Sequence, residues 1–331
     1  MLNIIKNLNA TPSVSGREKA ISDKILTYIA PLTDKVWEDA MGNLIAYKRG
    51  SGTERKKIML CAHMDEIGFM VTHIDDRGFI RISQVGGINY VAAAYTYVVS
   101  EKGVRGVIVP DAGTAPADIK FDKVYIDIGA KDKKDAEKKV RIGDFFVCES
   151  SVTKIGKKLC GRPMDDRIGC AIMIKIAEKL MGEDCKNDIY YCFSSQEEVG
   201  ARGSKPAAFA IDPDCGLAFD VTGTGDVPGA KPMECALGNG AAIKLKDQSV
   251  ICDKEIVDKL TDLAIANDIK YQYEILTYGG TDTSSMQVTR GGVKAGALSV
   301  PTRYIHSGVE MIDMNDCDAC VDLALAFVKE Y

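Results

Sequence analysis

The sequence lacks the features that mark several common protein classes. No apolar run approaches the ~20 residues that span a bilayer, and residues 1–16 are too polar and too interrupted by Pro and Gly for a signal peptide. No basic block stands out, and 42 Lys and Arg against 47 Asp and Glu give a net charge of −5. We therefore expect no membrane partner, no nucleic-acid partner and a cytoplasmic location.

Nucleotide-binding and serine-hydrolase motifs are also missing. The glycines form neither G-x-G-x-x-G after a strand nor a P-loop, and neither G-x-S-x-G nor H-E-x-x-H occurs. Eleven cysteines are spread evenly over a long chain, which predicts reduced, mostly buried thiols rather than a disulfide framework. Cys317 and Cys320 form a C-x-x-C at the start of the predicted last helix, a position that does not favour redox chemistry.

The remaining composition is that of a folded protein with about two domains. Of 331 residues, 46% are hydrophobic and 27% are charged. Residues 67–159 consist of closely spaced β segments with almost no helix, among them FMVTHID, GFIRISQV, YVAAAYTYVV, GVIVP, VYIDIG and DFFVCES. This stretch predicts an inserted all-β domain, either a barrel or a sandwich.

The flanking residues 1–66 and 160–331 alternate between helical and strand patterns, which predicts an α/β domain with a mixed, mostly parallel sheet and helices on both faces. We expect strands at 36–39, 43–47, 58–62, 188–195, 215–219, 243–245, 271–276 and 294–300, and helices within the first thirty residues and at 168–180, 253–267 and 315–331.

Potential metal ligands follow four of these strands. In open α/β sheets, ligands bind beyond the carboxyl ends of the strands. His63, the pair Glu197 and Glu198, Asp220 and, after a short loop, His306 lie there. Crowded carboxylates resist ionisation unless a positive charge sits among them, and imidazole with carboxylate suits Zn, Co or Mn better than Mg or Ca.

Asp165 and Asp166 directly precede a predicted helix. Either one alone could simply cap the helix. The functional hypothesis is that one carboxylate bridges two metal ions, because the resulting set would then give each ion one His, one terminal carboxylate and a share of the bridge. The five candidate ligands are His63, Asp165, Glu198, Asp220 and His306.

The adjacent acids Glu197 and Glu198 cannot easily bind one ion, because neighbouring side chains on extended backbone point in opposite directions. One interpretation is that one of the two acids binds a metal ion and the other acts as a general base. The alternative is that both are solvated acids in a loop. Asp65 can orient the imidazole of His63, although His63 alone could be a structural histidine. We expect His73 at the surface of the insert and Cys61 buried beneath the site.

Five segments resemble the signature segments of a known family, the tetrahedral or TET-type metallo-aminopeptidases. This family includes glutamyl, leucyl and lysyl aminopeptidases and proteins once labelled endoglucanase. The resemblance covers essentially the full chain and is carried by AHMDEIGFMV at 62–71, MDDRIG at 164–169, SQEEVGARG at 195–203, AFDVT at 218–222 and RYIHSGVE at 303–310. One departure is Pro163 and Met164, where small or aliphatic residues are commoner.

The resemblance implies a role for each candidate residue. Asp165 would bridge two ions, His63 and Asp220 would bind one of them, and Glu198 and His306 the other. Glu197 would be the general base and Asp65 the carboxylate behind His63. Thr281 and Asp282 belong to a segment that resembles a loop near the substrate. The insert would mediate dimerisation, and the dimers would assemble into a hollow dodecamer.

The implied activity is removal of N-terminal residues from peptides by hydroxide attack at a di-metal centre, with Zn or Co as the expected ions and Mn as a further candidate. Its substrates are peptides with a free N-terminus, and the sequence leaves the preferred N-terminal residue open. Two other classes stay in consideration. A glycoside hydrolase would need two carboxylates across a sugar cleft and no obligatory metal, and a non-catalytic scaffold would keep only the assembly.

Overall fold

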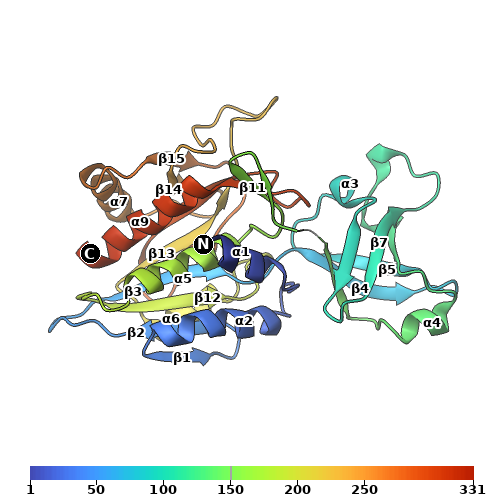
Figure 1. Cartoon of the computed structure of the whole chain (residues 1–331), viewed down its shortest axis with the longest axis horizontal. Coiled ribbons are helices and arrows are strands. Elements are labelled where there is room, and N and C mark those ends of the chain that lie inside the picture. Colours follow the sequence, from blue (N-terminus) through green and yellow to red (C-terminus); the bar gives the residue numbers. More distant parts are fainter. Residues whose placement is uncertain (150) are drawn as a thin grey trace.

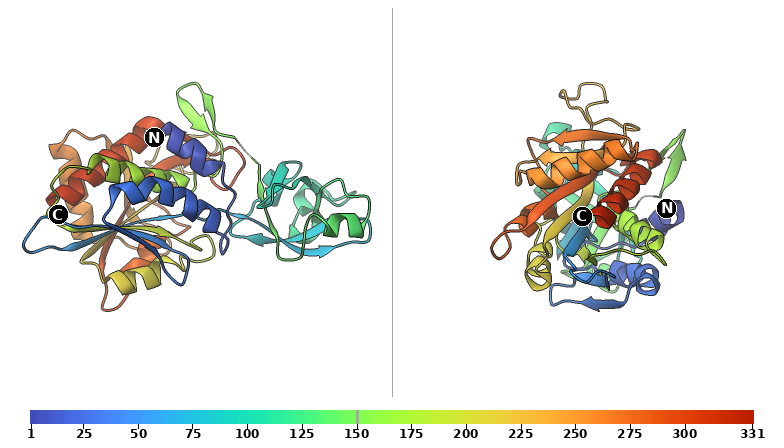
Figure 2. Two further views of the ribbon diagram at one scale, coloured as in Figure 1. Left: turned by 60° about the horizontal axis from the view of Figure 1, so that its bottom comes forward. Right: turned by 90° about the vertical axis from the view of Figure 1, so that its left-hand side faces the viewer.

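The computed structural model describes residues 1–149 and 151–331. The described chain forms two bodies, a larger α/β unit that contains both termini and a smaller β-barrel (Figure 1). The two bodies lie end to end, which makes the molecule elongated (Figure 2). None of the helices in the described part of the chain combines the length and the apolar character needed to cross a membrane.

The larger unit is built on a mixed sheet of eleven strands among the described residues. Its centre is parallel and consists, in spatial order, of β12 (Asp188–Ser194), β3 (Lys57–His63), β13 (Cys215–Thr222) and β16 (Lys294–Arg303). Antiparallel strands flank this centre: β1 (Lys35–Glu38) and β2 (Leu44–Lys48) on one side, and β17 (Met311–Asp313), β11 (Lys158–Cys160) and β10 (Thr153–Ile155) on the other. β14 (Ala241–Lys246) pairs with β16 and with the outer strand β15 (Tyr271–Ile275).

Helices cover both faces because the central strands bury both of their faces. Along β3, Ile58, Leu60 and Ala62 belong to the main core, whereas Met59 and Cys61 belong to a second core across the sheet. The main core is covered by α1 (Leu2–Asn9), α2 (Lys19–Ile29), α5 (Arg167–Lys179), α7 (Lys254–Ala266) and α9 (Met314–Glu330), and the second core by α6 (Ser204–Ile211) and α8 (Asp282–Gln287).

The barrel closes by antiparallel pairing of six strands. In spatial order these are β4 (Gly68–Ile74), β5 (Ile80–Val85), β8 (Val124–Asp127), β7 (Arg105–Pro110), β6 (Tyr97–Ser100) and β9 (Phe145–Cys148). Its own hydrophobic core includes Phe69, Ile80, Ile126 and Phe146. The predicted α/β fold with an inserted all-β unit is therefore confirmed, and the insert is a barrel rather than a sandwich.

Several local predictions differ from the structure. Residues 90–93, expected within a strand, form the one-turn helix α3 (Tyr90–Ala93), because the side chain of Asn89 accepts a hydrogen bond from the Ala92 amide and caps the turn. The insert contains a second short helix, α4 (Lys133–Glu137), and single turns at Pro116–Asp118 and Phe121–Lys123. The barrel strands end at Cys148, and the hairpin β10–β11 that follows belongs to the large sheet.

Candidate metal centre

Parallel strands of the large sheet bring the predicted residues to one edge. His63 is the last residue of β3, Glu197 and Glu198 follow β12, Asp220 lies near the end of β13, and His306 follows β16. Ser194 lies opposite His63 in the register, and Asp220 lies opposite Ser299. Because β12, β3, β13 and β16 are neighbours, residues far apart in the sequence converge beyond their carboxyl ends.

Five of these residues form two groups with the spacing of metal ligands. His63, Asp165 and Asp220 form one group, and Asp165, Glu198 and His306 form the other, with the ligand atoms of each group within 4.8 Å of one another. In the first group, His63 Nε2 lies 3.1 Å from Asp165 Oδ1 and 4.0 Å from Asp220 Oδ1. In the second, His306 Nε2 lies 3.2 Å from Asp165 Oδ2 and 3.3 Å from Glu198 Oε2. The two oxygens of Asp165 therefore face different groups.

Asp165 and its neighbour Asp166 have different contacts. Asp166 is the N-cap of α5, and its Oδ1 accepts a hydrogen bond from the Gly169 amide at 2.9 Å. The capping alternative thus applies to Asp166, which is fully buried, and leaves the carboxylate of Asp165 to face both imidazoles. Positive partial charge at the start of α5 also lies next to the acids and reduces the cost of collecting them.

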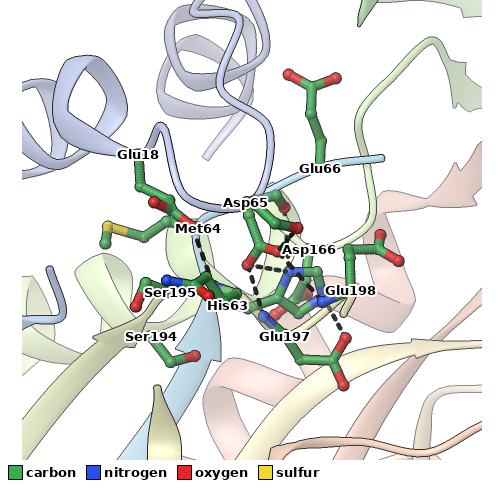
Figure 3. A network of polar contacts seen from close by, with 12 residues as sticks. Glu18, His63, Met64, Asp65, Glu66, Asp166, Ser194, Ser195, Glu197 and Glu198 are labelled. Carbon is green, nitrogen blue, oxygen red and sulfur yellow. Dashed lines mark hydrogen bonds and ion pairs between the residues drawn. The ribbon is translucent and has the colours of Figure 1, made fainter. Parts of the chain in front are cut away.

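Asp65 holds His63 and the segment after β12 together (Figure 3). Its Oδ1 accepts from the Glu197 amide at 3.0 Å and lies 3.5 Å from His63 Nδ1, while its Oδ2 accepts from the Glu198 amide at 3.2 Å. Burial opposes ionisation of Asp65, but its bonds with His63 and Ser15 bring the pKa of Asp65 below its usual value. This carboxylate is therefore ionised and fixes the imidazole.

Glu197, in the segment after β12, points into the site. Its Oε2 lies 4.0 Å from His63 Nε2, and its side chain lines the cavity described below. Burial raises the pKa of Glu197, and the neighbouring charges of Asp220 and Asp282 raise it further. A carboxyl with a raised pKa beside the donor groups has the properties of a proton-transferring residue.

The sequence did not predict a further carboxylate that supports the site, that of Glu18. Glu18, which is 6% exposed, accepts a hydrogen bond from the Gln196 amide at 3.0 Å and another from the Gly16 amide at 2.7 Å. Gln196 has a φ of 57°, a backbone conformation that residues other than Gly rarely adopt. Glu18 thus fixes the turn that aims Glu197 and Glu198, and no local sequence pattern marks it for that role.

The donor set suits divalent cations. Burial alone would lower the pKa of His306, but Asp165 and Glu198 raise it to about 11. Within the described residues, Glu198 Oε1 and Asp166 Oδ2 are buried without a hydrogen-bond partner. Excess negative charge and an unpartnered carboxylate oxygen in a buried site are the conditions that a bound cation relieves. Imidazole nitrogen with carboxylate oxygen fits Zn, Co or Mn.

A cavity of ≈ 790 Å³ opens beside the two groups. Its lining includes Asp165, Glu197, Glu198, Asp220 and His306 together with Val227, Leu276, Tyr278 and Thr281. His63 is not among the lining residues, because it is 1% exposed and lies behind the others. The cavity has the volume to admit a ligand of peptide size to the side of the donor set that Asp165, Glu198 and His306 line.

The other candidates are placed as follows. Thr281 caps α8 and lines the cavity. Asp282 is not among the lining residues, because it is only 2% exposed, and its carboxylate accepts hydrogen bonds from Ser194 and Cys61. Cys61 is fully buried beneath the site, as expected, and His73 is exposed on the barrel.

Comparisons with known proteins identify the family of this chain. Residues 42–323 match the family described as M42 glutamyl aminopeptidase. A putative aminopeptidase of Acetivibrio thermocellus is 43% identical over 98% of this chain and 97% of its own length. The resemblance to aminopeptidases seen in the sequence motifs is thereby confirmed.

Solved structures show the same similarity. The aminopeptidase APDkam598 of Desulfurococcus kamchatkensis is 36% identical, with a TM-score of 0.96 over 99% of this chain and 94% of that one. The TET1 peptidase of Pyrococcus horikoshii, which can assemble into a tetrahedron or a large octahedral shell, is 34% identical, with a TM-score of 0.89 over 100% of this chain and 99% of that one. The chain is therefore a peptide hydrolase of the M42 glutamyl aminopeptidase family.

Proposed function

We propose that this aminopeptidase removes N-terminal residues from peptides with the help of two divalent metal ions. The observation that carries the proposal is the position of Asp165, whose Oδ1 faces His63 and whose Oδ2 faces His306. One ion would be held by His63, Asp165 and Asp220, and the other by Asp165, Glu198 and His306. We propose Zn or Co as the ions, with Mn as a further candidate.

When bound, such ions would supply Lewis acidity and lower the pKa of water towards neutrality. Glu197 takes the proton of the attacking water and delivers it to the leaving amine. Asp65 keeps the His63 imidazole oriented and holds the backbone amides of Glu197 and Glu198. Glu197 lines the cavity, whereas Asp65 is fully buried and acts through His63 and the backbone.

Peptides with a free N-terminus would enter the cavity beside the donor groups. The position of Thr281 in the cavity wall supports a contact between Thr281 and the substrate. The buried carboxylate of Asp282 supports only an indirect role, in which it holds Ser194 next to the end of β3. Family membership favours peptide hydrolysis over the glycosidase alternative.

Replacing Glu197 with Gln tests the mechanism. The amide cannot accept the proton, so we expect hydrolysis of aminoacyl anilides to fall about 10²–10⁴-fold while both ions stay bound. Glu198→Gln is the matched control, because it removes a proposed ligand instead and should lose one ion. Metal content and hydrolysis are measured on the same samples. Undiminished hydrolysis by Glu197→Gln would remove Glu197 from this role.

We further propose that residues 67–159 mediate dimerisation and that dimers assemble into a dodecamer. The exposed side chains of Val91, Tyr97, Phe121 and Ile142 on the barrel support an interface there. The described assemblies of the Pyrococcus horikoshii relative support a closed shell. All cysteines are buried free thiols, which supports the proposed cytoplasmic location.

A further inference from the structure

Glu310 connects the two segments that carry Asp165 and His306. Glu310 is the last residue of the loop between β16 and β17, and its side chain, which is 1% exposed, reaches the loop before α5. Oε2 accepts hydrogen bonds from the amides of Met164 at 2.6 Å and Asp165 at 3.3 Å. Oε1 accepts a hydrogen bond from the amide of His306 at 2.9 Å. One carboxylate thus ties together two loops that are far apart in the sequence.

Both loops need this support. His306 has a φ of 61°, in the left-handed region that disfavours residues with a Cβ, and such a conformation persists only where the surroundings hold it. The bond from its amide to Glu310 provides that hold. On the other side, the amide of Asp165 is fixed while its carboxylate faces both donor groups.

The cost of burying Glu310 is offset in part by the buried guanidinium of Arg162, which interacts favourably with the carboxylate, although burial still raises the pKa of Glu310 to about 7. Glu310 can therefore keep both oxygens directed at the backbone of the ligand-bearing loops.

We propose that Glu310 is a positioning residue that sets the spacing between Asp165 and His306 and thereby controls metal affinity at the group formed by Asp165, Glu198 and His306. The inference rests on the proposed di-metal function. We do not propose Glu310 as a metal ligand, because both of its carboxylate oxygens accept hydrogen bonds from backbone amides.

Two conservative variants test the role. Glu310→Gln keeps the shape but offers one oxygen and an NH₂ group that cannot accept, so one of the two loops loses its acceptor. Glu310→Asp keeps both oxygens on a shorter side chain. Glu66→Gln is the matched control, because Glu66 is also 1% exposed and beside Arg162, but its carboxylate contacts Arg167 and the Ser13 amide rather than these loops.

The readout is the affinity of the metal-free full-length protein for Co²⁺, which equilibrium dialysis and visible absorption measure. In a His63→Ala background the remaining ion occupies the His306 group, and there Glu310→Gln should weaken binding by about 10–100-fold. In a His306→Ala background the remaining ion occupies the His63 group, which shares only Asp165 with the contacts of Glu310, and we expect a smaller loss of affinity there than at the His306 group. Glu66→Gln should change neither affinity.

The outcomes separate this inference from the proposed function. A wild-type protein that binds no ion contradicts the proposed function itself. A wild-type protein that binds two ions whose affinities Glu310→Gln and Glu310→Asp leave unchanged overturns only the role of Glu310. Equal weakening by Glu66→Gln, or failure of both Glu310 variants to fold without metal, would make Glu310 a fold-stabilising residue and would also overturn the proposal.

Discussion

At the scale of single residues, adjacent acids in this protein have different tasks. Asp166 caps a helix while Asp165 faces two imidazoles, and Glu198 contacts His306 while Glu197 points into the cavity. The sequence was sufficient to select both pairs, because they follow predicted strands or precede a predicted helix. It could not have selected Glu18 or Glu310, because the distant amides that they bind, those of Gln196 and Met164, are brought close only by the folded chain.

The two histidines should be separable by metal analysis. His63→Ala and His306→Ala each remove the imidazole of one donor group and leave the other group intact, so each variant should lose one ion preferentially. His73→Ala is the control, because His73 is exposed on the barrel away from the donor groups. Inductively coupled plasma mass spectrometry after dialysis measures the metal content. Loss of both ions, or of neither, from the two site variants would contradict the two-group arrangement.

At the scale of elements, long buried strands were predicted well and short elements were not. The apolar run at 58–62 and its parallel neighbours determine where the site lies, and these strands were recognisable because burial on both faces makes them continuously apolar. The helices α6 and α8 span only Ser204–Ile211 and Asp282–Gln287, too short for a clear helical period. The placement of β10 and β11 in the large sheet depends on pairing with the distant β17, which no local pattern encodes.

A first prediction at this scale concerns the loop 223–240 at the cavity rim. An ion pair with two hydrogen bonds, between Asp226 and Arg303, holds this loop to β16. Arg303 Nε lies 2.9 Å from Asp226 Oδ1, and Nη2 lies 2.6 Å from Oδ2. Burial opposes ionisation, but Arg303 outweighs it and lowers the pKa of Asp226 to about 2. Because the pKa in the folded state is below its unfolded value, the pair contributes stability above about pH 4 and loses it as the pH falls towards 2.

Asp226→Asn should therefore lower the free energy of unfolding by about 1–2 kcal/mol at neutral pH, after allowance for solvent screening of a partly exposed pair. The difference from wild type should stay constant between pH 7 and 5 and fall to roughly half at pH 3. Urea unfolding in the presence of a chelator measures it. A difference that is the same at pH 3 as at pH 7 would show that the Asp226 charge is not responsible.

A second element of interest is the loop after β5, which brings the barrel against the metal centre. A Cβ added at Gly87 would lie 3.1 Å from His306 Nδ1 and 3.3 Å from Cε1, so Gly87→Ala should push the imidazole by a few tenths of an ångström. We expect about 3–10-fold weaker binding at the His306 group. Gly291→Ala is the control, because a Cβ there meets no atom within 4 Å. Equal Co²⁺ affinities of the two variants would contradict the contact.

At the scale of the whole molecule, the apolar surface of the barrel is the feature that a single chain does not explain. Val91 is 56% exposed and Tyr97 is 68% exposed. Twelve copies of a 35.8 kDa chain would give a particle of about 430 kDa. Light scattering should report that mass for wild type and a smaller species for Val91→Lys with Tyr97→Lys. Met181→Lys, at a side chain 62% exposed on the larger unit, is the control. Unchanged mass in the double variant would place the interface elsewhere.

The point at which the barrel enters the chain has its own consequence. The polypeptide leaves the larger unit directly after His63 and Asp65, whereas on its return it first forms the hairpin β10–β11 of the large sheet and then reaches Asp165. The outgoing connection of the barrel therefore starts at a residue of the donor groups. A tilt of the barrel would act on the end of β3 through residues 64–67 and on His306 through the close approach of Gly87. If the barrel forms the proposed dimer interface, subunit packing would then influence the proposed metal centre through the covalent chain.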